Sequence, residues 1–303
     1  MRALLASAVL IPALALAEEE GEPKIRLRNH EPILAGYTWD SDDVGFLDVS
    51  ISLQHPILAE ALDEGNRYGL LPYFAFTARF GQYVGTRDSS PVIAKRFNPK
   101  LFVRYAFGEF PASGESADEY LDFEYAHESN GQSVDSAEGF QTLAQGLGSS
   151  EYAKDHISRG WDYLGVTWKS AWDREPARLR LYLSRKWYCG CWMQGEVEQV
   201  FAFEEPREIQ SIKQVSGWRA VLTLDTGSDN PIVDRGALIL DTGTRDTFKY
   251  NTVRLELGIP AVKNFTGVPL IVWARTGYLS DLAQYYAKVS SFGVAFELRT
   301  LNR

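Results

Sequence analysis

The sequence has few cysteines and no excess of basic residues. Its two cysteines, Cys189 and Cys191, stand two positions apart, so a framework of disulfides cannot hold the fold together. Lys and Arg number 31 against 40 Asp and Glu, which gives a formal net charge of -9 at pH 7. A face that binds nucleic acid is rich in Lys and Arg. The composition therefore argues against nucleic acid as a partner.

Long hydrophobic runs are also missing beyond the N-terminus. Residues 1–17 combine a positive residue, an apolar stretch and the ending Ala15-Leu16-Ala17, which is typical of a secretory signal peptide. The alternative is an N-terminal anchor, for which the apolar stretch is short. No later apolar run reaches about 18 residues, so we expect no transmembrane helix. We predict an exported protein in which residues 18–303 form a single domain.

What the sequence does contain is alternation of apolar and polar residues with a period of two. It is clearest in 47–54 and 292–299, where apolar residues recur at every second position. Such alternation predicts β-strands, and no strong helical period competes with it, apart from a short helical turn that 57–66 could form. Further strand-like segments are 69–82, 95–108, 119–129, 160–172, 179–184, 216–226, 235–243, 253–257 and 268–278, with weaker candidates near 32–39 and 198–214.

Two architectures share this pattern. A soluble β-sandwich or barrel turns its apolar face inward, whereas a transmembrane barrel turns it toward lipid and keeps a polar interior. Strands of about ten residues, Trp and Tyr near segment ends, and charged residues in mid-strand such as Asp48, Arg104 and Arg254 favour the second. We therefore predict an all-β fold, a transmembrane antiparallel β-barrel of about 12 strands in a bacterial outer membrane.

The segment 121–131 carries groups that can do chemistry. His127 and Ser129 share the parity of its apolar residues, which places both on the lipid-facing side near the strand end. Side chains two residues apart on a strand point the same way, about 6.5–7 Å apart along the chain. A base beside a hydroxyl is what a serine nucleophile needs. A histidine on a strand is more often structural, and a hairpin that emerges from the bilayer would also carry such polar groups.

A third polar group lies in the segment 158–168. Asp162 has the parity of Leu164 and Val166, so it should also point outward. If this strand pairs with 119–129, Asp162 could orient the His127 ring and stabilise the imidazolium that forms during catalysis.

These segments resemble motifs of the bacterial outer-membrane phospholipase A family. The family pattern H-x-S-N-G is matched by 127–131, and its S-R-x-W-N pattern is similar to 158–162. Ser89-Ser90-Pro91, the run 97–102 and the hairpin segment 277–282 are similar to other stretches of the family. The resemblance extends over nearly the whole mature chain, and the two motifs together are more specific than either alone.

The resemblance implies a 12-stranded barrel that hydrolyses acyl esters of phospholipids by a calcium-dependent serine-hydrolase mechanism. By matching positions, Ser129 is the nucleophile, His127 the general base, and Gly131 lends its backbone N–H to the oxyanion hole. The alternative from another class is a passive outer-membrane pore or structural barrel with a decayed site. A periplasmic or secreted β-protein is a third reading.

The resemblance also implies a calcium ion (Ca²⁺) and a second subunit. Ser158 matches a calcium ligand, and Gln132 and Ser89 match positions that contribute backbone oxygens. In the family, the counterpart of Ser89 comes from the partner subunit, so the active form would be a homodimer.

The sequence departs from the family pattern in two places. Asp162 stands where the family has Asn, which would give a Ser–His–Asp set and move the acid limb of activity to higher pH. Residues 134–155 are an insertion, which we expect to be a solvated surface loop, although it could cover the site or alter calcium binding or partner choice. A bridge between Cys189 and Cys191 is conceivable in an oxidising compartment, but cysteines at this spacing in an extended chain are poorly placed to join.

Overall fold

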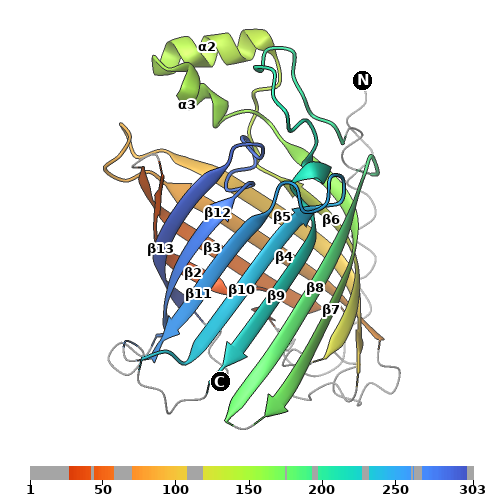
Figure 1. The fold of residues 1–303 in the computed structure, drawn as a ribbon. Coiled ribbons are helices and arrows are strands. Elements are labelled where there is room, and N and C mark those ends of the chain that lie inside the picture. The colour runs from red at the N-terminus through yellow and green to blue at the C-terminus, as the bar shows by residue number, and fades with distance from the viewer. Residues whose placement is uncertain are drawn as a thin grey trace, which may run out of the picture.

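The computed structural model describes residues 27–41, 44–57, 70–107, 119–174, 176–192, 197–226, 232–260, 262 and 268–298, which build a closed β-barrel (Figure 1). Its strands are β1 (Arg28–Asn29), β2 (Ile33–Asp40), β3 (Gly45–Pro56), β4 (Leu70–Gln82), β5 (Val92–Ala106), β6 (Tyr120–Ser129), β7 (Gly160–Arg174), β8 (Ala177–Cys189), β9 (Gly217–Asp225), β10 (Arg235–Gly243), β11 (Thr252–Ile259), β12 (Leu270–Gly277) and β13 (Val289–Leu298). The predicted signal peptide, 1–17, and residues 58–66 of the predicted helical turn lie outside the described residues.

The barrel is antiparallel throughout and closes between its first and last long strands. From β2 to β13 each strand pairs with its neighbour in sequence, and β13 pairs with β2. The prediction of a barrel of about 12 strands is confirmed, with β1 as one extra strand. Among the described residues, no helix is both long and apolar enough to span a membrane.

The extra strand β1 lies in line with β2, along the same edge of β3. Both pair with β3: Asn29 lies opposite Leu53, and Leu34 lies opposite Ser50. The residues between them, His30 to Pro32, break the ladder, which fits a proline that has no N–H to donate. The interruption lets the His30 and Glu31 side chains contact residues of the barrel interior.

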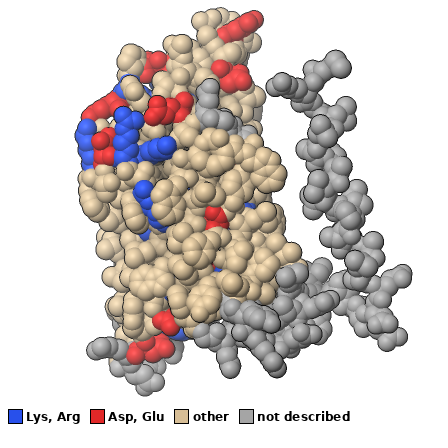
Figure 2. Space-filling model, turned by 90° about the vertical axis from the view of Figure 1, so that its right-hand side faces the viewer, with Lys and Arg blue, Asp and Glu red and all other residues tan. Residues whose placement is uncertain are grey.

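Side-chain parity separates an apolar outer face from a polar interior. On β5, Leu101, Val103 and Tyr105 are at least 40% exposed, whereas Lys100 and Arg104 are at most 6% exposed. This is the inverse of a soluble protein and confirms the inside-out pattern predicted from the alternation. Figure 2 shows one side of the barrel with a broad, mostly uncharged middle band and charged residues mainly toward its ends.

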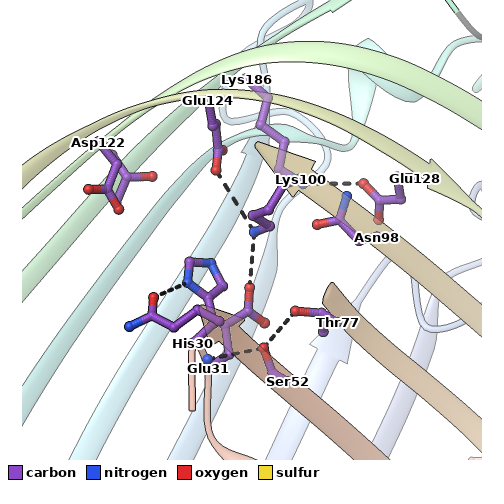
Figure 3. Close-up of polar contacts among 12 residues, drawn as sticks. His30, Glu31, Ser52, Thr77, Asn98, Lys100, Asp122, Glu124, Glu128 and Lys186 are labelled. Carbon is purple, nitrogen blue, oxygen red and sulfur yellow. Dashed lines mark hydrogen bonds and ion pairs between the residues drawn. The ribbon is translucent and has the colours of Figure 1, made fainter. Parts of the chain in front are cut away.

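Several charged residues of the interior are paired. The Lys100 ammonium lies between Glu31 (3.5 Å) and Glu124 (3.8 Å), as Figure 3 shows. Arg104 forms a bidentate pair with Asp122 at 2.7 and 2.8 Å, with both side chains almost completely buried. Pairing of this kind is what makes buried charges tolerable, as the sequence-based interpretation of the mid-strand charges required.

Loops and a short helix pack over one end of the barrel. The helix η2 (Ile212–Gln214) and the hairpin segment 278–288 bury Ile212, Leu282 and Tyr285 against Trp161 and Tyr163 of β7. The prediction of a weak strand near 198–214 is therefore wrong. Instead of continuing a sheet, this segment folds over the rim and bonds the start of β7.

The insertion 134–155, predicted to be a solvated surface loop, contains two helices and lies at the surface. It contains α2 (Ala137–Leu147) and α3 (Ser150–Lys154), which lie beyond the barrel rim in Figure 1. Serine side chains cap both N-termini, and Gly148 ends α2 in the left-handed region with φ 64°. No residue of α2 is fully buried, but its apolar residues Phe140, Leu143 and Leu147 recur at helical spacing along one face.

The insertion is fastened to the rim through one aspartate. The Asp155 carboxylate accepts from Arg87 Nη1 (2.5 Å) of the β4–β5 turn and from Gln284 Nε2 (2.8 Å) of the 278–288 segment. The Arg87 guanidinium also stacks on the rings of Tyr83 and Tyr152 at 4.3 Å. Three segments distant in sequence are therefore held together at the end of the barrel that carries the site.

Asp281 in the same segment provides a test of this rim. Burial of its carboxyl, and next the nearby Asp155, raises the pKa of Asp281 to about 7. The folded state thus favours the protonated form of Asp281. The stability that this protonated carboxyl contributes is lost as pH rises from about 4, the ordinary pKa of Asp, to about 7. We expect Asp281→Asn to raise the apparent Tm at pH 8 by a few degrees and to leave it nearly unchanged at pH 4.

The comparison needs an exposed aspartate as control. Asp88→Asn in the neighbouring turn removes the same charge where the side chain is exposed. Thermal scans of the folded protein at pH 4, 6 and 8 should separate the two variants. An equal response of both variants at all three pH values would contradict the buried, protonated state of Asp281.

Candidate active site

The pairing of β6 with β7 brings the predicted polar groups side by side. His127 lies opposite Asp162, and Ser129 lies opposite Gly160. The inward neighbours Ala126 and Glu128 are buried, whereas Phe123 on the same parity as His127 is 51% exposed. His127 and Ser129 thus lie on the outer face, near the end of β6, as the alternation predicted.

The imidazole and the carboxylate form a direct contact. His127 Nδ1 lies 2.8 Å from Asp162 Oδ1, with the His127 side chain 16% exposed and the Asp162 side chain fully buried. A carboxylate at Nδ1 favours the tautomer with a proton on that nitrogen. The other ring nitrogen, Nε2, is then the one able to accept a proton from a hydroxyl.

Gly160 provides the space in which Ser129 and His127 approach each other. A Cβ on Gly160 would lie 3.2 Å from Ser129 Cβ and 3.4 Å from His127 Cε1. Both side chains therefore lie over the bare backbone of this glycine. No direct hydrogen bond between them is recorded in the described part of the chain, and such bonds are often long without substrate.

The backbone of His127 is held from inside the barrel. The register between β5 and β6 skips Asn98 and Pro99, and Pro99 has no N–H to offer. Asn98 Nδ2 donates to the His127 carbonyl (2.9 Å) instead, and Tyr163 Oη donates to Asn98 Oδ1 (3.1 Å). This support was not predicted, although the Asn-Pro pair opposite the site was a visible signal.

Asn130 fastens the loop after β6 to the loop before β7. Its Oδ1 accepts from the Arg159 N–H (3.0 Å), and its Nδ2 donates to the Ile157 carbonyl (2.8 Å). The side chain is 1% exposed. Asn130 belongs to the H-x-S-N-G motif at 127–131, which predicted no role for it. In the structure its side chain joins the two halves of the site.

A second clamp holds the first residue of β7. Gly160 N–H donates to Gln199 Oε1 (3.1 Å), and Gln199 Nε2 donates to the Gly160 carbonyl (2.6 Å). Arg159, 2% exposed, donates to the Gln199 carbonyl (2.5 Å) and to Glu204 Oε1 (2.5 Å). These contacts hold the glycine under His127 and Ser129. The sequence of 197–204 did not predict these hydrogen bonds, because they form only when this loop packs over the barrel rim against the start of β7.

Three further predicted site residues lie on the two loops beside Ser129. Gly131 has φ +61°, which favours glycine, and its N–H has no acceptor among the described residues. Gln132 N–H donates to Asn130 Oδ1 (3.3 Å), and Ser158 N–H donates to the Val134 carbonyl (2.8 Å). The structure thus brings Gly131, Gln132 and Ser158 to the same two joined loops.

Ser89 lies apart from these residues in the chain. It is exposed in the β4–β5 turn with φ 63°, next to the Arg87 that bonds Asp155. No contact of Ser89 with Gln132 or Ser158 is recorded within the described residues. Nor do three or more His, Cys, Asp or Glu side chains gather there in an arrangement that could hold a metal ion.

Cys189 and Cys191 are joined by a disulfide, contrary to the expectation from their spacing. The expectation assumed an extended chain, but β8 ends at Cys189 and the chain turns at Gly190. Cys189 lies opposite Asp162 in the β7–β8 ladder. The disulfide is therefore adjacent to the His127–Asp162 pair.

The fold and the outward-facing cluster together define a membrane-type β-barrel with polar groups on its lipid-facing rim. No protein-family model and no curated sequence matches the chain. Its fold is similar to the Salmonella typhi outer membrane phospholipase dimer with bound calcium, at 15% identity and TM-score 0.58, covering 93% of this chain and 96% of the other. Escherichia coli outer membrane phospholipase A is similar at 15% identity and TM-score 0.58, covering 94% and 96%. The barrel predicted from the sequence is thus the fold of these phospholipase structures.

Proposed function

We propose that this protein is an outer-membrane phospholipase that hydrolyses acyl ester bonds of phospholipids with Ser129 as nucleophile. The observation that carries the proposal is the 2.8 Å contact between His127 and Asp162 on the lipid-facing surface, with Ser129 on the same face two residues away. Polar groups on such a surface are costly unless they are paired or used. A phospholipid in the outer leaflet would present its ester to this rim.

The residues have complementary roles in the proposed reaction. His127 Nε2 takes the proton of Ser129 Oγ as the hydroxyl attacks the ester carbonyl, and then delivers it to the leaving alcohol. Asp162 holds the ring and stabilises the imidazolium through Nδ1. The Gly131 N–H, which has no acceptor among the described residues, donates to the developing oxyanion. Water hydrolyses the acyl-enzyme by the same route.

The donor chemistry of the neighbouring loops fits a calcium ion. Ser158 offers a hydroxyl, and Gln132 and Ser89 offer backbone carbonyls, all of them the oxygen ligands that calcium prefers. The Gln132 side-chain Nε2 is buried without a hydrogen-bond partner in the described residues; as a donor it calls for an acceptor, such as a water, and not for the cation itself. When bound, calcium would polarise a water that faces the developing oxyanion.

The homodimer that we propose is supported by the family resemblance, which assigns the position of Ser89 to a ligand from the partner subunit. In one chain this residue lies in the exposed β4–β5 turn, and no hydrogen bond among the described residues joins it to Gln132 or Ser158. Its proposed role as a ligand therefore requires a second subunit, whose turn would reach the loops of the first. The cellular location that we propose is the bacterial outer membrane, with 1–17 as a signal peptide removed on export.

The aspartate at position 162 predicts a specific pH dependence. A carboxylate in contact with the ring stabilises the protonated imidazole, which cannot act as a base. Asp162→Asn should therefore move the acid limb of the activity profile to lower pH while reducing the maximal rate. Rates measured from pH 5 to pH 9 test this, and a variant whose pH profile is unchanged would refute the role of the carboxylate.

The proposal is tested by phospholipid hydrolysis with detergent-refolded protein. Fatty acid release should require calcium and be suppressed by a chelator, with restoration when calcium is added back. A passive pore or structural barrel with a decayed site predicts no release under either condition. Membrane fractionation tests the location: a protein recovered only in the soluble periplasmic or secreted fraction would contradict it.

A further inference from the structure

A phospholipid whose ester reaches Ser129 places its head group beyond the end of β6. Its acyl chains lie along the apolar outer face, toward the middle of the membrane, so its phosphate lies on the other side of the ester, toward the barrel end. The insertion 134–155 lies beyond the rim at that end in Figure 1. The residues between Ser129 and the insertion are therefore the ones that a head group would meet.

One lysine on the outer face stands beside Ser129. On β5, Phe97 lies opposite Ser129, and Lys95 is two residues nearer the barrel end. The next residue, Arg96, turns inward and pairs with the buried Glu128, so alternation along the strand directs Lys95 outward. Lys95 forms no hydrogen bond or ion pair with another described residue. Its ammonium is therefore available to a ligand on the outer surface.

The imidazole of His156 lies near this ammonium, in the segment that returns from the insertion to β7. Burial lowers the pKa of His156, and the nearby charges of Lys95 and Arg87 lower it further against the opposing effect of Asp155. The Val134 N–H donates to the His156 carbonyl (3.2 Å), which joins the segments before and after the insertion. Lys95 therefore lies close to the place where the insertion begins and ends.

A groove of about 580 Å³ starts at this place and follows α2. Hydroxyl groups, an imidazole, a carboxylate and an apolar side chain line it, and they belong to Ser133, Ser136, Glu138, Thr142, His156 and Leu143. The helix is held in position by Phe140, whose ring stacks on Phe203 with the ring centroids 5.2 Å apart. A groove of this size can accept a small polar group such as a lipid head group.

The charges along this path are complementary to a zwitterionic head group. The Lys95 ammonium has the charge that a phosphodiester prefers. The Glu138 side chain is exposed in the first turn of α2, and no Lys or Arg pairs with it in the described part of the chain, whereas Glu151 of α3 is paired with Lys154. A carboxylate attracts the ammonium of an ethanolamine head group, whereas a glycerol head group offers it no charge.

We propose that Lys95 and the groove along α2 form the head-group subsite: Lys95 binds the phosphate, and Glu138 binds the amine of a phosphatidylethanolamine. The inference rests on the proposed function, since it takes the ester to lie at Ser129. The insertion then selects the substrate by its head group. Both residues bind a part of the substrate that does not react, so their removal should change KM more than kcat.

The first test compares phosphatidylethanolamine with phosphatidylglycerol of identical acyl chains, in mixed micelles with calcium. Wild-type protein should hydrolyse the ethanolamine lipid with about a three- to fivefold higher kcat/KM, the size expected of an exposed charge pair. Glu138→Gln should remove this preference and leave the rate on the glycerol lipid unchanged. Lys95→Gln should raise KM about tenfold for both lipids, because both contain the phosphate.

The pair formed by Glu151 and Lys154 provides matched controls. Both residues belong to α3 of the same insertion and are not among the residues that line the groove. Glu151→Gln and Lys154→Gln should keep the wild-type KM and the wild-type preference. A wild type that does not distinguish the two lipids would overturn the proposal. So would Glu138→Gln and Lys95→Gln proteins that behave like these controls.

Binding without catalysis separates this inference from the proposed function. In a Ser129→Ala background, dioctanoyl phosphatidylethanolamine should bind the detergent-solubilised barrel more tightly than dioctanoyl phosphatidylglycerol in calorimetric titrations. Adding Glu138→Gln should abolish the difference. Selective binding by a wild-type protein that releases no fatty acid would uphold the subsite and contradict the proposed function. Hydrolysis by a protein that binds both lipids equally would overturn the subsite and leave the proposed function intact.

Discussion

Ser129→Ala is expected to abolish calcium-dependent fatty acid release, with a loss of about 10³-fold or more. The substitution removes only the Ser129 hydroxyl group, which is the nucleophile of the proposed reaction. Loss of a triad nucleophile leaves only the catalysis that binding and oxyanion stabilisation supply. His127→Ala should cost a similar factor, and the double variant should cost little more, because the two groups act as a unit.

The appropriate control removes a hydroxyl elsewhere on the same rim. Ser150 in α3 is exposed and belongs to the insertion, so Ser150→Ala should retain wild-type turnover. Heat-dependent migration on gels and circular dichroism would show that all variants are folded. Equal turnover by Ser129→Ala and wild type would exclude Ser129 as the nucleophile and favour a passive barrel or another site.

Gly160→Ala is expected to reduce turnover by about 10- to 100-fold while leaving the barrel folded. The added Cβ would lie 3.2 Å from Ser129 Cβ, so Ser129 must shift by a few tenths of an ångström, and it would reach His127 Cε1 at 3.4 Å, the limit of ordinary van der Waals contact. A small displacement of reacting groups is enough for a large loss of rate. Because the change affects the alignment of the two groups, kcat should fall more than KM rises.

A glycine with open space is the matched control for this substitution. At Gly236 of β10 the nearest atom to an added Cβ would be Leu257 Cδ2 at 4.0 Å. Gly236→Ala should therefore leave turnover unchanged and could stabilise the strand slightly, because alanine loses less conformational freedom on folding. If Gly160→Ala kept full activity, Ser129 and His127 would not need the space over this backbone.

Alternation alone was enough to place the main chemical groups. The parity of His127, Ser129 and Asp162 followed from the period of a strand, and the β6–β7 register then brought His127 opposite Asp162. The register itself is a long-range property, since Ser129 and Gly160 are separated by the insertion. From the sequence, the contact between Asp162 and His127 could be predicted only on the condition that the two strands pair.

The features that the sequence did not reveal depend on contacts between distant segments. The cysteine pair was judged as part of an extended chain, whereas β8 ends at Cys189. The supporting roles of Asn130 and Gln199 arise only when two loops meet at the start of β7. None of these leaves a periodic signal in the chain.

The most direct measurement is active-site labelling with a fluorophosphonate, followed by peptide mass spectrometry of the folded barrel in detergent with calcium. A phosphonate reacts only with a serine activated by a neighbouring base. The account predicts stoichiometric modification at Ser129, which is lost in His127→Ala and slowed in Asp162→Asn. Modification of a different serine, or an unmodified Ser129 in a protein that still releases fatty acid, would contradict it.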